Sequence, residues 1–207
     1  MTENSFHARL ARITYEDTSG DNDTLTRYGF IIEAEEAVAE RLAALQLEVP
    51  QAPPSSIDEE SALRLALYQF LIGNTDWSFI RGAGQDVCCH NVHLIEKNGG
   101  LFPIPYDFDI SGLVNASYAK PNSIVGTKRV TQRVYRGYCK LPIDRVAPAL
   151  EKITALREPI MLLVEESPVA GDEDTDSRVR YIGHFFKDAE NAAKLLKQFD
   201  ADCVGPR

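Results

Sequence analysis

LIGNTDWSFIRGAGQDVCCHNVHLIEKNGGLFPIPYDFDISG, residues Leu71 to Gly112, is the stretch that decides how this chain folds and what it could hold. It places an acid after a predicted helix end (Asp76), an amide beside a histidine (His90 and Asn91), and an Asp-Phe-Asp triplet that begins at Asp107. Carboxylate and amide oxygens are ligands that hard divalent cations prefer. Acids and an amide, spaced along alternating turns and strands, predict a site that holds a divalent metal and phosphate.

A buried helix is predicted just before Asp76. Apolar side chains recur there at i, i+4, i+7 and i+8, which is one face of a helix. They are Leu63, Leu67, Phe70 and Leu71. Ser56 and Glu59 form a capping-box signature for the start of this helix. Gly73 and Asn74 supply the usual chemistry for its end, so Asp76 is expected in a turn beyond a well-anchored helix.

Two strands joined by a tight turn are predicted after Asn91. The strands are Val92 to Glu96 and Leu101 to Tyr106, and the turn between them is Lys97 to Gly100 (KNGG). Asn-Gly and Gly-Gly are strong hairpin signals. Asp107 would then follow directly on the second strand.

Before the buried helix, the chain reads as a hairpin, a helix and a corner. Alternating apolar residues predict strands at Phe6 to Tyr15 and Leu25 to Glu33, with a turn at Glu16 to Asp23. Ala and Leu interspersed with charges predict a helix over Ala34 to Leu47. Two prolines in Gln51 to Ser56 (QAPPSS) cannot continue that helix, so a corner is expected there.

The second half of the chain is predicted to be mainly helical. Helices are expected over Ile143 to Leu156 and Ser177 to Phe199, separated by a short apolar stretch (Ile160 to Val164) and an acidic surface loop (Gly171 to Asp176). Asp144 is expected to be the N-cap of the first of them. Strands followed by helices predict an α+β fold.

Length and composition limit the function classes. A chain of 207 residues with 44% apolar residues fits one domain, or a small lobe attached to a larger one. A formal net charge of −9 argues against a nucleic-acid or anionic-membrane partner, because both need a basic face. A local basic segment runs from Lys128 to Arg136. Within it, Arg133 and Arg136 are candidates to bind a phosphorylated or acidic substrate, and a structural arginine pair is the alternative.

The cysteines predict no disulfide framework, because a domain this large does not need one, and reduced thiols in a cytosolic compartment are expected. They are Cys88, Cys89, Cys139 and Cys203. A zinc site is disfavoured, since His90 and His93 would lie on opposite faces of a strand and the spacing fits no standard pair. With no apolar run of membrane-spanning length and no signal-peptide core at the start, the sequence predicts a cytoplasmic protein.

The order of these motifs resembles the C-lobe of protein-kinase-like folds. Within that superfamily it is most similar to atypical kinases of the spore-coat CotH type, with a weaker similarity to HipA-like kinases. The matching residues are Asn74-Thr75-Asp76, His90-Asn91 and Pro105-Tyr106-Asp107-Phe108-Asp109. The strand Tyr28 to Glu33, followed by a helix, also resembles the end of the CotH N-lobe, and the similarity spans Arg27 to Gly112.

The resemblance implies roles for single residues. Asp76 would be the catalytic acid, and Asn91 and Asp107 would ligate metal, with Asp109 binding a second metal or supporting the loop. The cofactor would be Mg²⁺ or Mn²⁺ with ATP, and the reaction a phosphate transfer to a protein or small-molecule acceptor. Residues 51–207 would form the kinase-like, mostly helical C-lobe, and residues 1–50 a truncated or reduced N-lobe.

Three departures from the kinase pattern weigh on this prediction. Asp76 and Asn91 lie much farther apart than in the HRDxxxxN loop, so Arg81 to Gln85 would have to loop out. The triplet is Asp-Phe-Asp in place of Asp-Phe-Gly. The chain has no lysine before Lys97 and no glycine-rich phosphate loop upstream of Asp76. The phosphate-gripping group would then have to be an arginine, and the candidates are Arg9, Arg12 and Arg27.

Two other functions remain open. The first is a catalytically degenerate kinase-like module that binds nucleotide or a partner, which the missing lysine favours. The second is an unrelated α+β interaction domain. In that case Asp76 would hydrogen-bond its own turn, and Asp107 and Asp109 would flank one buried aromatic at a strand end.

Overall fold

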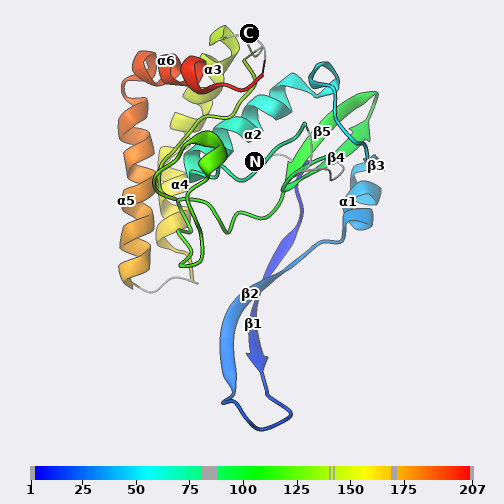
Figure 1. Cartoon of the computed structure of the whole chain (residues 1–207), viewed down its shortest axis with the longest axis vertical. Helices are drawn as coiled ribbons and strands as arrows, with labels where there is room; N and C mark the ends of the chain where they lie inside the picture. Colours follow the sequence, from blue (N-terminus) through cyan, green and yellow to red (C-terminus); the bar gives the residue numbers. More distant parts are fainter. Residues whose placement is uncertain (1–2, 81–87, 140, 142, 169–171, 206–207) are drawn as a thin grey trace.

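Two small antiparallel sheets and six α-helices make up the described part of the chain, which confirms the α+β class (Figure 1). The structure is a computed structural model. It describes residues 3–80, 88–139, 141, 143–168 and 172–205. The predicted loop at residues 81–85 lies outside the described residues.

The first sheet is the predicted N-terminal hairpin. Strands β1 (Ala8–Tyr15) and β2 (Leu25–Ile32) pair antiparallel from Ala8↔Ile32 to Tyr15↔Leu25. No other described strand joins them. The hairpin extends away from the rest of the molecule (Figure 1). It is therefore covered on neither edge by the described residues.

The helix predicted over Ala34 to Leu47 is wrong beyond its middle. Helix α1 spans Glu35–Leu42 and ends at Ala43, which has a left-handed φ of 49°. Residues Leu45–Leu47 form strand β3, which pairs with β4 (Val92–Lys97). The helical pattern was overridden there by pairing with a strand that is distant in sequence.

Helix α2 (Glu59–Ile72) matches the predicted buried helix, but its cap differs. Asp58 is the N-cap, and its carboxylate accepts from the backbone N–H of Ser61 at 2.9 Å. Ser56 instead ends the 3₁₀ turn η1 (Pro54–Ser56). At the other end, Gly73 adopts the left-handed φ of 67° that favours glycine, as predicted.

The second sheet has the strand order β3-β4-β5. Strand β5 (Gly100–Pro105) pairs antiparallel with β4, from Lys97↔Gly100 to Val92↔Pro105. Asn98 and Gly99, between the strands, both have positive φ, as a tight hairpin turn requires. The predicted hairpin is confirmed, and its open end brings Asn91 opposite Tyr106.

Four helices form the C-terminal layer (Figure 1). They are α3 (Ile143–Thr154), α4 (Arg157–Glu165), α5 (Asp172–Ala189) and α6 (Ala192–Asp202).

This layer corrects four predictions. The residues from Asp172 onward are not a loop but the first turns of α5. Asp174 lies there near the helix N-terminus, where negative charge is favourable. The single helix predicted to Phe199 is divided at Asn191, whose side chain caps α6. The short apolar stretch is part of α4. Asp144 lies in the first turn of α3 rather than at its N-cap.

Helix α2 lies at the centre of the main core. Leu67 and Phe70 are buried on it. The Phe70 ring makes edge-to-face contacts with Phe199, Phe185 and Tyr135, at centroid distances of 4.8, 6.2 and 6.3 Å. These contacts join α2 to α5 and α6. The C-terminal turn of α2, which leads to Asp76, is therefore packed against other helices.

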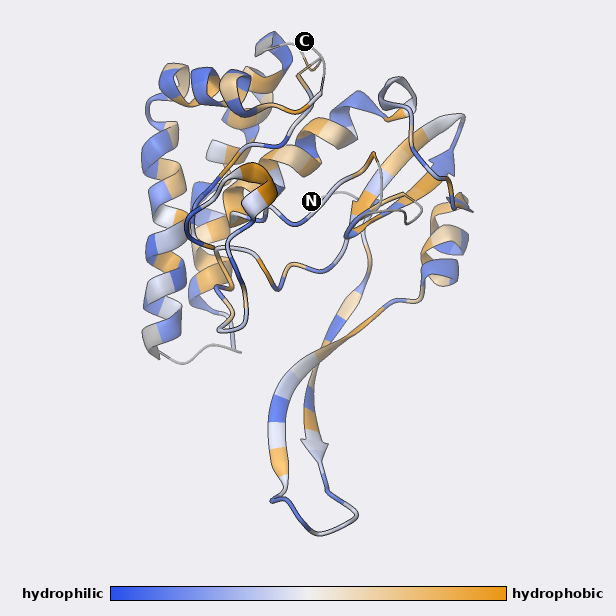
Figure 2. Cartoon of the chain, in the orientation of Figure 1, coloured by the Kyte–Doolittle hydropathy of each residue, from blue (hydrophilic) through white to orange (hydrophobic). Residues whose placement is uncertain are grey.

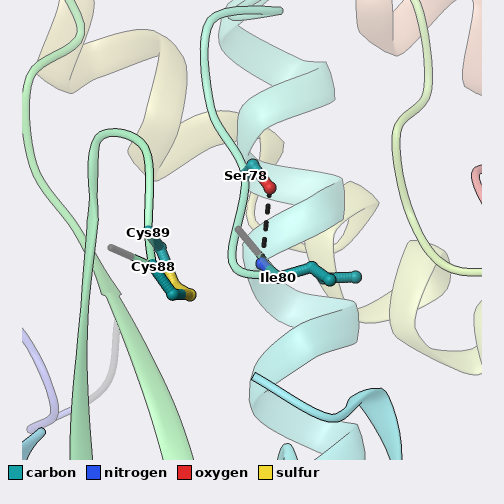
Figure 3. The surroundings of a disulfide bond; sticks show 4 residues. All are labelled: Ser78, Ile80, Cys88 and Cys89. Atoms are coloured by element: carbon teal, nitrogen blue, oxygen red, sulfur yellow. Dashed lines mark hydrogen bonds between the residues drawn. A yellow bond between two sulfur atoms is a disulfide. The ribbon is translucent and has the colours of Figure 1, made fainter. Parts of the chain in front are cut away.

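The expectation of reduced thiols is wrong, because the structure pairs all four cysteines. Cys88 is bonded to its neighbour Cys89, close to Ser78 and Ile80 (Figure 3). The other bond joins two residues whose Cα atoms lie 4.9 Å apart, Cys139 and Cys203.

Backbone pairing sets up the second of these bonds. Gly137 accepts from the N–H of Val204 at 2.9 Å, and Cys139 donates to the Val204 carbonyl at 3.0 Å. The C-terminal segment is thereby held against the segment that carries Arg136. Within the described residues, none of the helices is long and apolar enough to cross a lipid bilayer.

Candidate functional site

Asp76 lies in a tightly bonded turn at the end of α2. The N–H of Asn74 bonds the carbonyl of Gln69 at 2.8 Å, which continues the helix cap. The buried Asn74 side chain then accepts from the N–H of Asp76 at 2.8 Å, and the Asn74 carbonyl accepts from Nε1 of Trp77 at 3.2 Å. The turn holds Asp76 at a fixed position next to the buried Trp77 ring.

The Asp76 carboxylate contacts both residues of the predicted histidine-amide pair. Nδ2 of Asn91 donates to the Asp76 carbonyl at 2.7 Å and to Oδ2 at 3.2 Å. Nε2 of His90 lies 2.9 Å from Oδ1. A carboxylate only accepts, so His90 is the donor in that bond. The structure therefore brings Asp76 and Asn91 together, as the sequence predicted, and adds His90.

Backbone pairing explains this meeting across a long stretch of sequence. Ser78 and His90 exchange two backbone hydrogen bonds of 2.9 Å each, which lays the Asp76 turn beside the start of β4. The carbonyl of Asn91 accepts from the N–H of Tyr106 at 3.1 Å. The end of β5 is thereby placed at the same edge.

Asp107 lies two positions after the end of β5, next to Tyr106, which is opposite Asn91. Both residues have left-handed φ angles, 55° for Asp107 and 53° for Asn91. This conformation is uncommon outside glycine, although Asn and Asp tolerate it best. The carboxylate of Asp107 lies 3.4 Å from the N–H of Asp109. Asp109 in turn accepts from the hydroxyl of Tyr118 at 2.8 Å.

The carboxylates of this cluster disfavour one another's charge. Partial burial, the neighbouring Asp109 and the charge of Asp76 raise the pKa of Asp107 above its ordinary value. The bond to Asp109 likewise raises the pKa of Tyr118. Like charges that raise a pKa are relieved by a cation between them.

The donor set fits a hard divalent cation. Because Nδ2 of Asn91 faces two acceptor oxygens of Asp76, its amide oxygen is not engaged in those bonds and is available as a ligand. Carboxylate oxygens from Asp107 and Asp109 would supply the charge. Within the described part of the chain, no group of three or more His, Cys, Asp or Glu side chains is clustered as a metal site.

The two candidate arginines occupy different places. Arg136 donates to the carbonyl of Thr75, directly before Asp76. Arg133 donates to the carbonyls of Leu71 and Tyr181, and its guanidinium carbon lies 3.8 Å from the Tyr181 ring centroid. Substrate binding by either arginine stays a prediction, and Arg136 alone adjoins the Asp76 turn.

Two hollows of the surface can be placed relative to this site: the larger lies at the opposite end of α2, and the smaller adjoins the Asp76 turn. One, of about 370 Å³, is lined by residues of the N-terminal segment, of α2 and of β5, including Arg64 and Phe102. A second, of about 20 Å³, adjoins Trp77 and Arg136. The candidate phosphate ligands Arg9, Arg12 and Arg27 are exposed on the β1–β2 hairpin.

Sequence reasoning gave His90 no role of its own and missed Asn122. His90 was named beside Asn91 in the kinase-like motif and weighed as a zinc ligand, but its bond to Asp76 was not predicted. Asn122 bonds the carbonyl of Thr75 at 2.9 Å and caps the 3₁₀ turn η2 (Ser123–Val125). A loop residue that is distant in sequence carries no local signal for such a contact.

Comparison with known proteins adds no family to these observations: no family model matches the chain, and no curated protein or solved structure is significantly similar to it.

Proposed function

We propose that this chain is a metal-dependent phosphotransferase of the atypical kinase type, with Asp76, Asn91 and Asp107 as its central residues. One observation carries the proposal: the side-chain amide of Asn91 bonds both the carbonyl and the carboxylate of Asp76, and the Asn91 carbonyl bonds the N–H of Tyr106, the residue before Asp107. Asp76 and Asn91 are thus in contact, and Asp107 follows the residue that pairs with Asn91; a kinase-like C-lobe uses an acid, an amide and a second acid in this order.

Each residue has a distinct task in this proposal. Asp76 orients the acceptor hydroxyl and takes its proton, while the bonds from His90 and Asn91 keep the carboxylate in place. Asn91 and Asp107 hold the cation, and Asp109 supports the loop. When bound with ATP, Mg²⁺ or Mn²⁺ would neutralise the charge on the transferring phosphate.

The fold assignment is part of the same proposal. A buried helix, an acid-bearing turn, a strand hairpin and an acidic triplet follow one another as in kinase-like C-lobes, and helices cover α2 on its other side. Likeness of element order is an analogy, since one fold hosts many functions. The site residues therefore carry more weight than the fold.

The test compares Asp107→Ala with wild type in Mg·ATP binding and in phosphate release or transfer. We expect the variant to fold, because Asp107 is exposed, and to lose binding and turnover. Glu151→Gln changes an exposed acid on α3 and serves as the control, with unchanged activity expected. An Asp107→Ala protein that binds Mg·ATP and transfers phosphate like wild type would refute the proposal.

A second function, nucleotide binding without catalysis, is favoured by one feature. No lysine precedes Lys97, so the usual phosphate-gripping side chain has no counterpart upstream of Asp76. A degenerate module would show a rise in melting temperature with Mg·ATP that Asp107→Ala abolishes, and no phosphate release from either protein. Turnover by wild type would exclude it.

A further inference from the structure

We propose that Arg136 is a positioning residue for Asp76, acting through the carbonyl of Thr75. The inference rests on the proposed function for its catalytic consequence. The contacts that carry it are independent of that function. It also differs from direct substrate binding by Arg136, because the guanidinium here acts on the backbone of the turn.

The peptide group between Thr75 and Asp76 is fixed on both sides. Its N–H donates to the Asn74 side chain at 2.8 Å. Its carbonyl accepts from two donors, Nδ2 of Asn122 at 2.9 Å and a terminal nitrogen of Arg136. The orientation of this peptide plane sets the direction in which the Asp76 side chain leaves the backbone.

Arg136 is the charged member of this pair of donors. Its guanidinium carbon lies 5.9 Å from the Trp77 ring centroid. Burial lowers the pKa of Arg136, and the charge of the nearby Asp76 carboxylate opposes that shift. Thr75 is 6% exposed, which leaves its carbonyl dependent on protein donors. Removing Arg136 would leave Asn122 as the remaining donor recorded for it.

Arg133 provides a matched comparison three residues earlier. It too is partly buried and donates to backbone carbonyls, those of Leu71 and Tyr181. These bonds tie the end of α2 to α5 and do not touch the Asp76 turn. Loss of Arg133 should therefore lower stability without redirecting Asp76.

The single tryptophan of the chain reports on the turn directly. Trp77 is 2% exposed, donates to the Asn74 carbonyl and stacks on Phe79 at 5.5 Å. The experiment measures acrylamide quenching of its fluorescence, together with kcat and KM for Mg·ATP. The variants are Arg136→Met, Arg136→Lys and Arg133→Met, each compared with wild type under conditions in which it is folded.

We expect Arg136→Met to make Trp77 more accessible to quencher. We also expect kcat to fall by roughly 10- to 100-fold with KM for Mg·ATP nearly unchanged, because a small misplacement of a catalytic group has costs of that order. Arg136→Lys keeps one donor for the Thr75 carbonyl and should recover part of both losses. Arg133→Met should melt at a lower temperature with wild-type quenching.

Asn122→Asp keeps the proposal testable if Arg136→Met does not fold. The aspartate retains the oxygen that accepts from Ile124 and loses the donor to Thr75. It should change quenching and kcat in the same direction as Arg136→Met. Folded Arg136 and Asn122 variants with wild-type quenching and kcat would overturn the proposal. If wild type transfers no phosphate, the proposed function fails. The positioning role is then decided by quenching in Asn122→Asp, which leaves the Arg136 guanidinium beside the Trp77 ring.

Discussion

The turn from Asn74 to Trp77 and the β1–β2 hairpin are held in different ways. In the turn, Thr75 and Trp77 are buried, and the carbonyls of Thr75 and Asp76 accept from side chains of other segments. In the hairpin, hydrophobic residues occur along both strands (Figure 2), which pair only with each other among the described strands. Phe30 on β2 is 69% exposed.

The hairpin is therefore stabilised by pairing between its own two strands, and the turn by contacts with parts of the chain that are distant in sequence. A two-stranded hairpin by itself is marginal in water, so the β1–β2 hairpin should open at low free energy. The turn is anchored to the main core because it follows α2 directly. It is anchored to the second sheet by hydrogen bonds from His90 and Asn91, which precede β4. A rigid turn is what a catalytic acid needs, because positions on well-packed elements are the most precise.

The largest expected effect is on the core beneath the turn. Phe70→Ala removes a ring that contacts three other aromatic rings, and such a change costs about 3–5 kcal/mol of unfolding free energy. Phe30→Ala removes an exposed ring from the hairpin and should change that free energy by no more than about 0.5 kcal/mol. Urea unfolding followed by circular dichroism measures both. Equal losses would break the comparison.

A second effect concerns the segment that carries Arg136. The Cys139–Cys203 bond joins residues 64 positions apart. Breaking it should lower the unfolding free energy by about 2–4 kcal/mol, because the unfolded chain is no longer restricted by the loop that the bond closes. Paired serine substitutions measured by thermal unfolding test this. The Cys88–Cys89 bond closes almost no loop, because the two residues are adjacent. Replacing both by serine should therefore lower the unfolding free energy by less. The reverse order would contradict this account.

A smaller effect is expected inside the turn itself. Asn74→Ala leaves the N–H of Asp76 without its acceptor, at a cost of about 1–2 kcal/mol. Asn22→Ala removes a comparable side-chain bond, to Asp17, at the exposed tip of the hairpin, and should be nearly neutral. Urea unfolding curves of the two variants give both losses of unfolding free energy. Similar losses would show that burial of the turn does not make its hydrogen bond more important.

The smallest effect is at the root of the hairpin. Bonds from Arg41 and from the N–H of His7 hold the pKa of Glu33 near 2, below its ordinary 4.5. A depressed carboxyl pKa stabilises the fold above the ordinary value, and that contribution is lost as the pH falls from about 4.5 to about 2. An NMR titration of the Glu33 carboxyl measures it. Arg41→Met should move the midpoint toward 4.5, and an unmoved midpoint would show that Arg41 is not the cause.

Much of the fold followed from local patterns in the sequence. Turn residues marked both hairpins, and a helical stripe ending at Gly73 placed Asp76 beyond α2. Predictions failed where distant partners decide the outcome. The residues of β3 had a helical pattern but pair with β4, and the acids near Asp172 begin a helix rather than a loop.

The candidate site shows the same division. Asp76, Asn91 and Asp107 could be selected because their residue types and order are informative. The roles of Asn122 and Arg136 could not, since both act on a backbone carbonyl more than forty positions away. His90 was visible in the sequence, but its bond to Asp76 depends on the pairing of Ser78 with the start of β4.

The central claim is that Asp76, Asn91 and Asp107 form one metal–nucleotide site. The most direct measurement is paramagnetic broadening of backbone NMR signals during titration with Mn²⁺ and ATP. We predict broadening centred on Asn91 and on residues 107–109, extending to Asp76, and its loss in Asp107→Asn. Broadening centred on the acidic hairpin tip, or a pattern that Asp107→Asn leaves unchanged, would contradict the account.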